Sequence, residues 1–172
     1  MRKVLLLALP LLFALLPVAA LSADSLVKFA GGIGVIPISN VLVAADGTIT
    51  VVRNAVRTVN SAGQIWVISD LEADVKSDGR IRVNGRGLLL GGGNNIGTNA
   101  NASVFATLIC EAAAPFTLRS TNPDGVPLAA NGDFQIDDVL SPAPGPVCAS
   151  PVLLIRNAAN LVWFAAGIVT NP

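Results

Sequence analysis

Apolar and β-branched residues gather in short stretches along most of the chain, and turn-forming residues separate these stretches. No segment between Gly31 and Thr170 has the 3.6-residue period of an amphipathic helix, so the pattern predicts strands. The expected strands cover residues 34–43, 48–53, 64–76, 80–90, 103–110, 115–120, 133–140, 152–156 and 161–169. The pattern therefore predicts an all-β fold, an antiparallel β-sandwich of about eight or nine strands, with a partly closed β-barrel as the alternative.

One hairpin can be predicted to the level of register. From Asp70 to Lys76 the even positions are polar and the odd positions apolar, and the same parity continues from Arg80 to Asn84. Because directly opposed residues share a face of the sheet, Lys76 must oppose Arg80, with Ser77-Asp78-Gly79 as the loop. The pairs then expected, as a solvated ladder rather than a ligand site, are Asp74 with Arg82, Glu72 with Asn84 and Asp70 with Arg86.

The first residues have the composition of a secretory leader. Arg2 and Lys3 precede an apolar stretch over residues 4–16, and Pro17-Val18-Ala19-Ala20 supplies the small residues of a cleavage region. The sequence therefore predicts a signal peptide over residues 1–20.

Cleavage is expected after Ala20 or as late as Ala23, which leaves a single domain over residues 21–172. A permanent membrane anchor is the competing interpretation, and two prolines within the leader disfavour it. The rest of the chain has no apolar stretch of membrane-spanning length, so we expect no membrane span after signal removal. The protein is expected to be secreted or to lie in the cell envelope.

The composition excludes several classes of function. The chain has 172 residues, of which 52% are hydrophobic and 13% charged, unlike a disordered polymer. Eleven Lys and Arg balance eleven Asp and Glu, so a broad basic field is missing and no nucleic-acid partner is expected. The chain has no histidine and no tyrosine, which excludes histidine bases, histidine metal ligands and phenolic acids. We expect no catalytic residue, no metal site and no cofactor.

Two cysteines, Cys110 and Cys148, can form a single intramolecular bridge. Since an exported protein meets an oxidising compartment, we expect that they do. The bridge would hold the proline-rich segment 141–151 against the strand that ends at Cys110. Two unpaired buried thiols are the alternative, and a catalytic cysteine is disfavoured because no histidine can act as its base.

The glycine- and asparagine-rich segment 91–101 is predicted to be a loop between two strands. Its glycines lack the spacing and the strand–helix context of a dinucleotide-binding motif. The loop is either a plain connection or a recognition loop carried by a rigid β scaffold. The candidate binding residues are Gly92, Gly93, Asn94, Asn95, Thr98 and Asn99. Asn101 also begins an acceptor pattern for N-glycosylation.

Carboxylates are the remaining acid–base groups, and they are densest at Asp133, Asp137 and Asp138. An exposed strand edge explains this pattern, and the competing interpretation is a polysaccharide hydrolase that uses Asp133 and Asp137. Trp66 and Trp163 lie in apolar runs, so they are expected in the core rather than on a sugar-stacking surface.

Several strand patterns resemble those of small exported bacterial β-sandwich proteins with no assigned activity. The segments that carry this resemblance are DGRIRVNGRGLLL, NASVFATLIC, GDFQIDDVL, PVLLIRN and WFAAGI. The resemblance covers about two thirds of the chain and implies a fold and a bacterial origin, without site residues.

The sequence favours an exported, non-catalytic module that binds a protein or a surface glycan, with the loop over residues 91–101 as the expected contact. The alternatives are a carboxylate-dependent polysaccharide hydrolase and a purely structural envelope protein.

Overall fold

The computed structural model describes residues 23–170, and this part of the chain contains strands and no helix. The leader predicted over residues 1–20 lies outside the described residues. All paired strands of the sheets are antiparallel, which confirms the all-β antiparallel fold. The strands are β1 (Ser25–Gly34), β2 (Ile38–Val43), β3 (Ile49–Arg53), β4 (Trp66–Val67), β5 (Asp70–Lys76), β6 (Arg80–Arg86), β7 (Leu89–Leu90), β8 (Ser103–Ile109), β9 (Arg119–Ser120), β10 (Val126–Pro127), β11 (Phe134–Val139), β12 (Val152–Asn157) and β13 (Trp163–Thr170).

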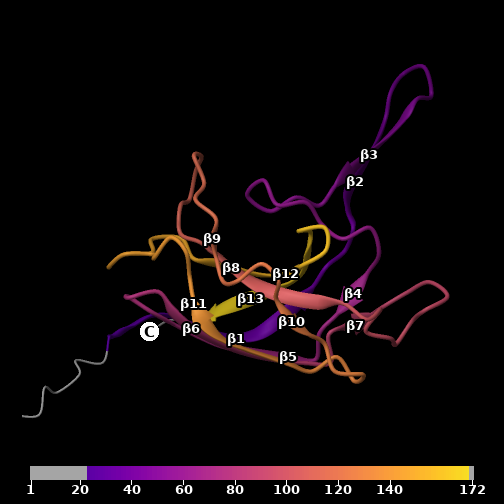
Figure 1. Cartoon of the computed structure of the whole chain (residues 1–172). Coiled ribbons are helices and arrows are strands. Elements are labelled where there is room, and N and C mark those ends of the chain that lie inside the picture. Colours follow the sequence, from indigo (N-terminus) through magenta and orange to yellow (C-terminus); the bar gives the residue numbers. More distant parts are fainter. Residues whose placement is uncertain (1–22, 171–172) are drawn as a thin grey trace, which may run out of the picture.

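One sheet forms the body of the molecule (Figure 1). Its strands follow the order β10-β8-β12-β13-β1-β5-β6-β11, and β9 pairs with β8 outside this path. The sheet curls so far that its two end strands, β10 and β11, lie next to each other. The body is therefore a nearly closed, barrel-like sheet, the arrangement that the sequence analysis names as the alternative to two separate layers.

The interior of this curled sheet is the hydrophobic core. β5 and β6 alternate buried apolar and more exposed polar residues, as a strand with one solvated face should. β8 and β12 are buried along almost their whole length, which means that both of their faces are covered. Among the larger side chains that are completely enclosed are Leu71, Ile81, Leu108, Leu153 and Ile155.

The β5–β6 hairpin has the predicted register. Asp74 opposes Arg82, and Asp70 opposes Arg86, across a loop that ends at Gly79 with a φ of 92°. The ion pairs, however, differ from the expected ladder: Asp74 binds Lys76 at 2.8 Å, and Arg82 binds Asp137 of β11 at 2.7 Å. β11 pairs with β6 and places Asp137 opposite Arg82. The two residues are far apart in the sequence, so the pattern of the β5–β6 hairpin does not predict this contact.

The expected strand over residues 34–43 is wrong at its start. The first strand is β1, which lies between β5 and β13 and ends at Gly34. The glycines of this strand look like a break in the sequence, but Gly31 has a φ of 87° and sits within a β-bulge. A Cβ on Gly34 would lie 2.1 Å from the carbonyl oxygen of Trp66, so only glycine allows β4 to cross here.

Other expected strands are shorter or divided. The segment 64–76 divides into β4 and β5, and the segment 80–90 divides into β6 and β7 at Gly87, where φ is 64°. Only the last two residues of the segment 115–120 form a strand, β9, and β10 was not predicted. The short pairs β4–β7 and β8–β9 depend on tertiary contacts, which strand periodicity does not encode.

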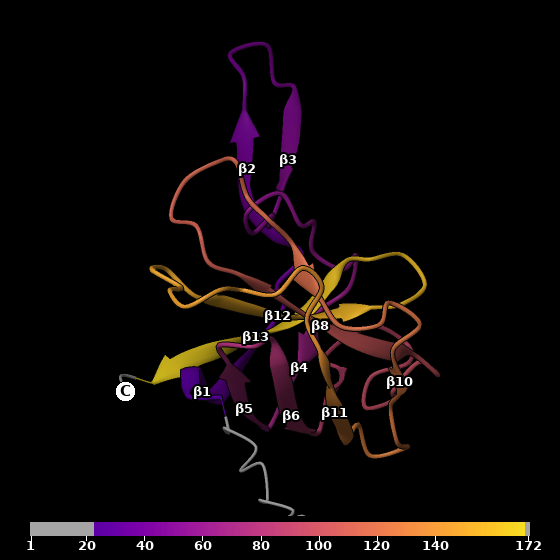
Figure 2. The same cartoon turned by 60° about the vertical axis from the view of Figure 1, so that its left-hand side comes forward.

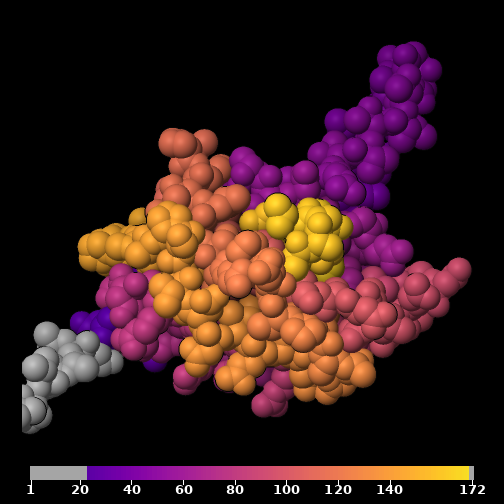
Figure 3. Space-filling view, in the orientation of Figure 1, coloured from indigo at the N-terminus to yellow at the C-terminus, as the bar shows by residue number. Residues whose placement is uncertain are grey.

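The hairpin of β2 and β3 is a separate two-stranded sheet that stands away from the body. Figure 2 shows it rising above the curled sheet, and the space-filling view in Figure 3 shows it as a finger with solvent around it. Asp46 and Gly47 lie in the connection between its two strands, where Gly47 has a φ of 85°. Every residue of both strands is exposed.

Candidate interaction surface

Hydrogen bonds at the base of the β2–β3 hairpin anchor it to the body. The carbonyl of Pro37 accepts hydrogen bonds from the backbone N–H of Asn54 at 3.0 Å and from the hydroxyl of the buried Ser61 at 2.9 Å. The side-chain amide of Asn54 donates to the carbonyl of Ile36, and the indole N–H of Trp163 donates to the carbonyl of Asn54. Both ends of the hairpin are thus tied to the core, so the finger projects in a defined direction.

One face of the hairpin is aliphatic except at its base, where it carries Arg53. Val41 opposes Val51 and Val43 opposes Ile49, and directly opposed residues lie on the same face. These four side chains, which we call the aliphatic face, are 51%, 52%, 68% and 66% exposed respectively. Ile38 extends this face toward the base, beyond a bulge in β2. An apolar strip of this kind normally lies against another surface, because the exposure of apolar side chains to water is unfavourable.

The opposite face of the hairpin, which we call the mixed face, carries Asn40, Leu42, Thr50 and Val52. Its polar side chains make it a more ordinary solvent-facing surface. Within the described residues, β2 pairs only with β3, so each strand keeps one edge whose backbone groups lack a strand partner. An isolated two-stranded hairpin is only marginally stable in water, and burial of its apolar side chains against a partner surface would stabilise it.

The sequence alone assigns the hairpin no function, because apolar runs usually indicate burial. A signal is nevertheless present in the sequence. Between Lys28 and Arg57 the only charged residues are Asp46 and Arg53, so two β-prone runs flank a turn without the charges that normally protect exposed strands.

The segment 91–101 is an ordered loop. Leu90 and Thr98 are joined by a backbone hydrogen bond of 2.9 Å, and the Gly97 N–H donates to the Leu90 carbonyl at 2.8 Å. Asn99 donates its side-chain amide to the carbonyls of Leu128 and Ala129, so it holds the base of the loop to the body. Among the predicted binding residues, Gly93, Asn94, Asn95 and Thr98 are exposed, whereas Gly92 and Asn99 are half-buried.

A hollow of about 490 Å³ lies beside the end of this loop. Its walls carry the polar residues Asn101, Ser103, Asp124 and Asn157, and its lining also includes Trp66 and Phe164. The rings of Trp66 and Phe164 stack with centroids 3.9 Å apart, but each residue is less than 5% exposed. The hollow therefore offers hydrogen-bonding groups and almost no aromatic surface. Trp163 is likewise 4% exposed, so the core placement of both tryptophans is confirmed.

The carboxylates considered for hydrolysis are not brought together. Asp133 accepts hydrogen bonds from the Gly87 N–H and the Asn131 side chain, so it shapes a turn. Asp137 forms the ion pair with Arg82. Asp133 directly precedes β11 and Asp137 lies within it, so an extended backbone separates them by about 13 Å, and the hollow beside Asp133 does not include Asp137. This spacing exceeds what two cooperating carboxylates need, so the geometry gives a hydrolase no support at these positions.

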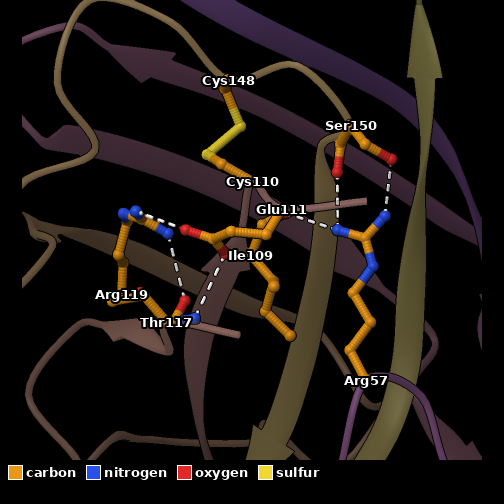
Figure 4. Close-up of polar contacts among 8 residues, drawn as sticks. All are labelled: Arg57, Ile109, Cys110, Glu111, Thr117, Arg119, Cys148 and Ser150. Atoms are coloured by element: carbon orange, nitrogen blue, oxygen red, sulfur yellow. Dashed lines mark hydrogen bonds and ion pairs between the residues drawn. A yellow bond between two sulfur atoms is a disulfide. The ribbon is translucent and has the colours of Figure 1, made fainter. Parts of the chain in front are cut away.

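The predicted disulfide is confirmed. Cys110 and Cys148 are bonded, with their Cα atoms 4.6 Å apart (Figure 4). Beside the bridge, Arg57 donates hydrogen bonds to the carbonyl of Ile109 at 3.0 Å and to the carbonyl of Ser150 at 2.6 Å. The bridge and the hydrogen bonds of Arg57 thus connect three parts of the chain. These parts are the proline-rich segment 141–151, the end of β8, and the segment around Arg57 that follows the hairpin.

An ion pair lies on the other side of this bridge (Figure 4). Arg119 and Glu111 are 2.7 Å apart, and the Thr117 N–H also donates to the Glu111 carboxylate. The hydrogen bond from Arg119 is the main reason why the pKa of Glu111 falls from 4.5 to about 2. The pair closes the loop between β8 and β9, and we assign it a structural role.

Comparison of the chain with protein-family models, with curated proteins and with solved structures finds no match. Residues 23–170 hold no cluster of three or more acidic or cysteine side chains suited to a metal ion. The same residues contain no helix that could cross a membrane. The resemblance to small exported β-sandwich proteins therefore stays a prediction, and the exposed hairpin is the surface that the geometry singles out.

Proposed function

We propose that the chain is a non-catalytic binding module that docks to a protein through the aliphatic face of the β2–β3 hairpin. The observation that carries this proposal is the exposure of Val41, Val43, Ile49 and Val51 on a projecting, anchored finger. Large aliphatic side chains that gather on one exposed face are typical of protein–protein contacts.

The proposed location is outside the cytoplasm, in the periplasm, the envelope or the medium of a bacterium. The Cys110–Cys148 bridge supports an oxidising compartment, and the basic and apolar residues at the start of the sequence are typical of an export signal.

The aliphatic face fits a protein better than a glycan or a bilayer. Glycans favour exposed aromatic rings and hydrogen-bonding groups, and this face has neither. A bilayer core does not accept open strand edges, because their backbone groups would stay unpaired. A protein surface can cover the aliphatic side chains and leave the edges in water.

Photo-cross-linking in the producing cell tests the proposal. A benzophenone amino acid at position 43 should form a covalent adduct with a protein, whereas the same probe at position 147 should not. The natural residues make a matched pair, because Val43 is 68% exposed and Val147 is 72% exposed. Adducts at both positions, or at neither, would overturn the proposal; the mass of the adduct identifies the partner.

The loop over residues 91–101 gives a second candidate, a site for a small polar ligand such as a glycan end. The hollow lined by Asn101, Asp124 and Asn157 is the observation that favours it. Titration with N-acetylglucosamine and with glucose should shift the amide NMR signals of Asn101 and Asn157 in a saturable way. Unchanged spectra at millimolar sugar would remove this candidate.

A further inference from the structure

We infer that the partner on the aliphatic face is a second copy of this chain, with the two hairpins packed face to face and antiparallel. This inference rests on the proposed docking role of the hairpin. It adds the identity of the partner and the orientation of the contact.

The aliphatic face exposes enough area for a contact between two copies. Val41, Val43, Ile49, Val51 and Ile38 are each about half exposed or more, so one copy presents on the order of 500 Å² of aliphatic surface. Two copies would bury about 1,000 Å², which lies at the lower limit for a specific interface. The expected complex is therefore a reversible dimer of micromolar affinity.

The shape of the aliphatic face suits a contact with a second copy of itself. The four residues of the aliphatic face have β-branched side chains without a polar atom, and such side chains interlock when two sheets pack about 10 Å apart. A two-fold axis makes every contact twice, so a surface that fits itself needs no other specificity. The finger projects away from the curled sheet, so a second finger can approach it (Figures 2 and 3).

The two ends of the hairpin carry opposite charges. Asp46 lies in the turn at the tip of the hairpin, and Arg53 lies at its base, opposite Ile38 and on the side of the aliphatic face. When two hairpins pack antiparallel, the tip of each lies over the base of the other. The carboxylate of Asp46 in one copy then approaches the guanidinium of Arg53 in the other, once at each end of the strip. A parallel arrangement would instead place like charges together, so charge selects the antiparallel one.

Sedimentation analysis tests whether the dimer exists and which face forms it. Between about 1 and 300 µM, the disulfide-bonded protein should pass from monomer to dimer. Val51→Lys should weaken the dimer at least about tenfold, because a lysine in the strip must be desolvated. Thr50→Lys is the matched control, since it places the same charge on the mixed face of the same strand, and it should change affinity by less than about threefold. A protein that stays monomeric, or equal effects of the two variants, would overturn the inference.

Charge reversal tests the antiparallel orientation. Asp46→Lys and Arg53→Glu should each weaken the dimer by about three- to tenfold, and the double variant should restore most of the affinity. Additive losses in the double variant would rule out the contact between Asp46 and Arg53, and with it the antiparallel arrangement.

A single new thiol gives a positive test. Val41 lies near the middle of the strip, so two copies of Val41→Cys should meet close to the two-fold axis and form an intermolecular disulfide under mild oxidation. Leu42→Cys, on the mixed face, should stay monomeric. The two native cysteines are bonded to each other and do not compete. If position 43 instead cross-links to a different protein and Val41→Cys gives no dimer, the docking role stands and the second-copy inference fails.

Discussion

The guanidinium of Arg57 holds Ser150, which follows it by 93 residues, through hydrogen bonds of 2.6 Å to its carbonyl and 2.6 Å to its hydroxyl. A third bond reaches the carbonyl of Ile109 at the end of β8. Arg57 has a φ of 46°, in the left-handed region, so these contacts hold a conformation that the backbone does not favour by itself. The side chain thus connects the segment that follows the hairpin to the segment that the disulfide closes.

Replacement of Arg57 should therefore destabilise the body. Arg57→Ala leaves two carbonyls without their partner, and the free energy of unfolding should fall by about 2–3 kcal/mol in urea denaturation. Arg57→Lys supplies a charge without the planar fork of donors, so it should recover only part of the loss. Equal stability of the alanine variant and the wild type would show that the three hydrogen bonds contribute nothing.

The stability contributed by Glu111 should depend on pH. Its pKa is depressed to about 2 in the folded protein, mainly by the hydrogen bond from Arg119, and is 4.5 without this environment. The contribution is therefore complete above about pH 5 and disappears as the pH falls toward 2. Glu111→Gln should lower the free energy of unfolding by about 1–2 kcal/mol at pH 7 and by much less at pH 2.5. Chemical denaturation at the two pH values measures the difference, and a pH-independent effect would contradict the assignment.

Parts of this fold follow from local rules of the sequence. The β5–β6 register is predictable because parity of polar positions and the length of the loop constrain each other, and the structure pairs Asp74 with Arg82 as expected. The bond between Cys110 and Cys148 is predictable because two cysteines allow one bridge.

Other parts depend on distant partners. The sequence does not predict β1, because Gly31 and Gly32 look like the end of a strand. In the structure these positions are glycine because Ile168, Ile68 and Leu71 approach so closely that a larger residue has no room. The candidate site was missed for a similar reason: an apolar run indicates burial, and only the tertiary structure shows that β2 and β3 pair with each other outside the body. The loop over residues 91–101, which the sequence favoured, has an ordered base that only the contacts of Asn99 reveal.

Gly34 should be intolerant of any side chain. A Cβ there would lie 2.1 Å from the carbonyl oxygen of Trp66 and 2.8 Å from the Cα of Val67, both in the backbone of β4, which cannot move aside cheaply. Gly34→Ala should cost about 3 kcal/mol of unfolding free energy. Gly63→Ala is the control, because its nearest neighbour is 3.7 Å away at the flexible end of Arg53. Thermal unfolding followed by circular dichroism should show a clearly lower Tm for the first variant alone.

Two asparagines of the 91–101 loop should behave differently. Asn99 binds two backbone carbonyls, so Asn99→Ala should reduce the free energy of unfolding by about 2 kcal/mol. Asn94 is exposed, and Asn94→Ala should change it by less than about 0.5 kcal/mol. Urea titration of both variants provides the measurement. A large effect at Asn94 and none at Asn99 would mean that the contacts with residues 128 and 129 do not hold the loop in solution.

The hairpin itself should be dispensable for folding. No residue of β2 or β3 belongs to the buried core, so replacement of residues 40–52 by a short Gly-Ser turn removes exposed surface only. The variant keeps Pro37 and Asn54, whose hydrogen bonds with Ser61 and Trp163 anchor the base of the hairpin to the body. Its monomer should unfold within about 0.5 kcal/mol of the full protein at low micromolar concentration, where the dimer is dissociated. At high concentration only the full protein should gain stability, because mass action adds the free energy of association. A loss of several kcal/mol in the truncated monomer would show that the finger serves the fold rather than a partner.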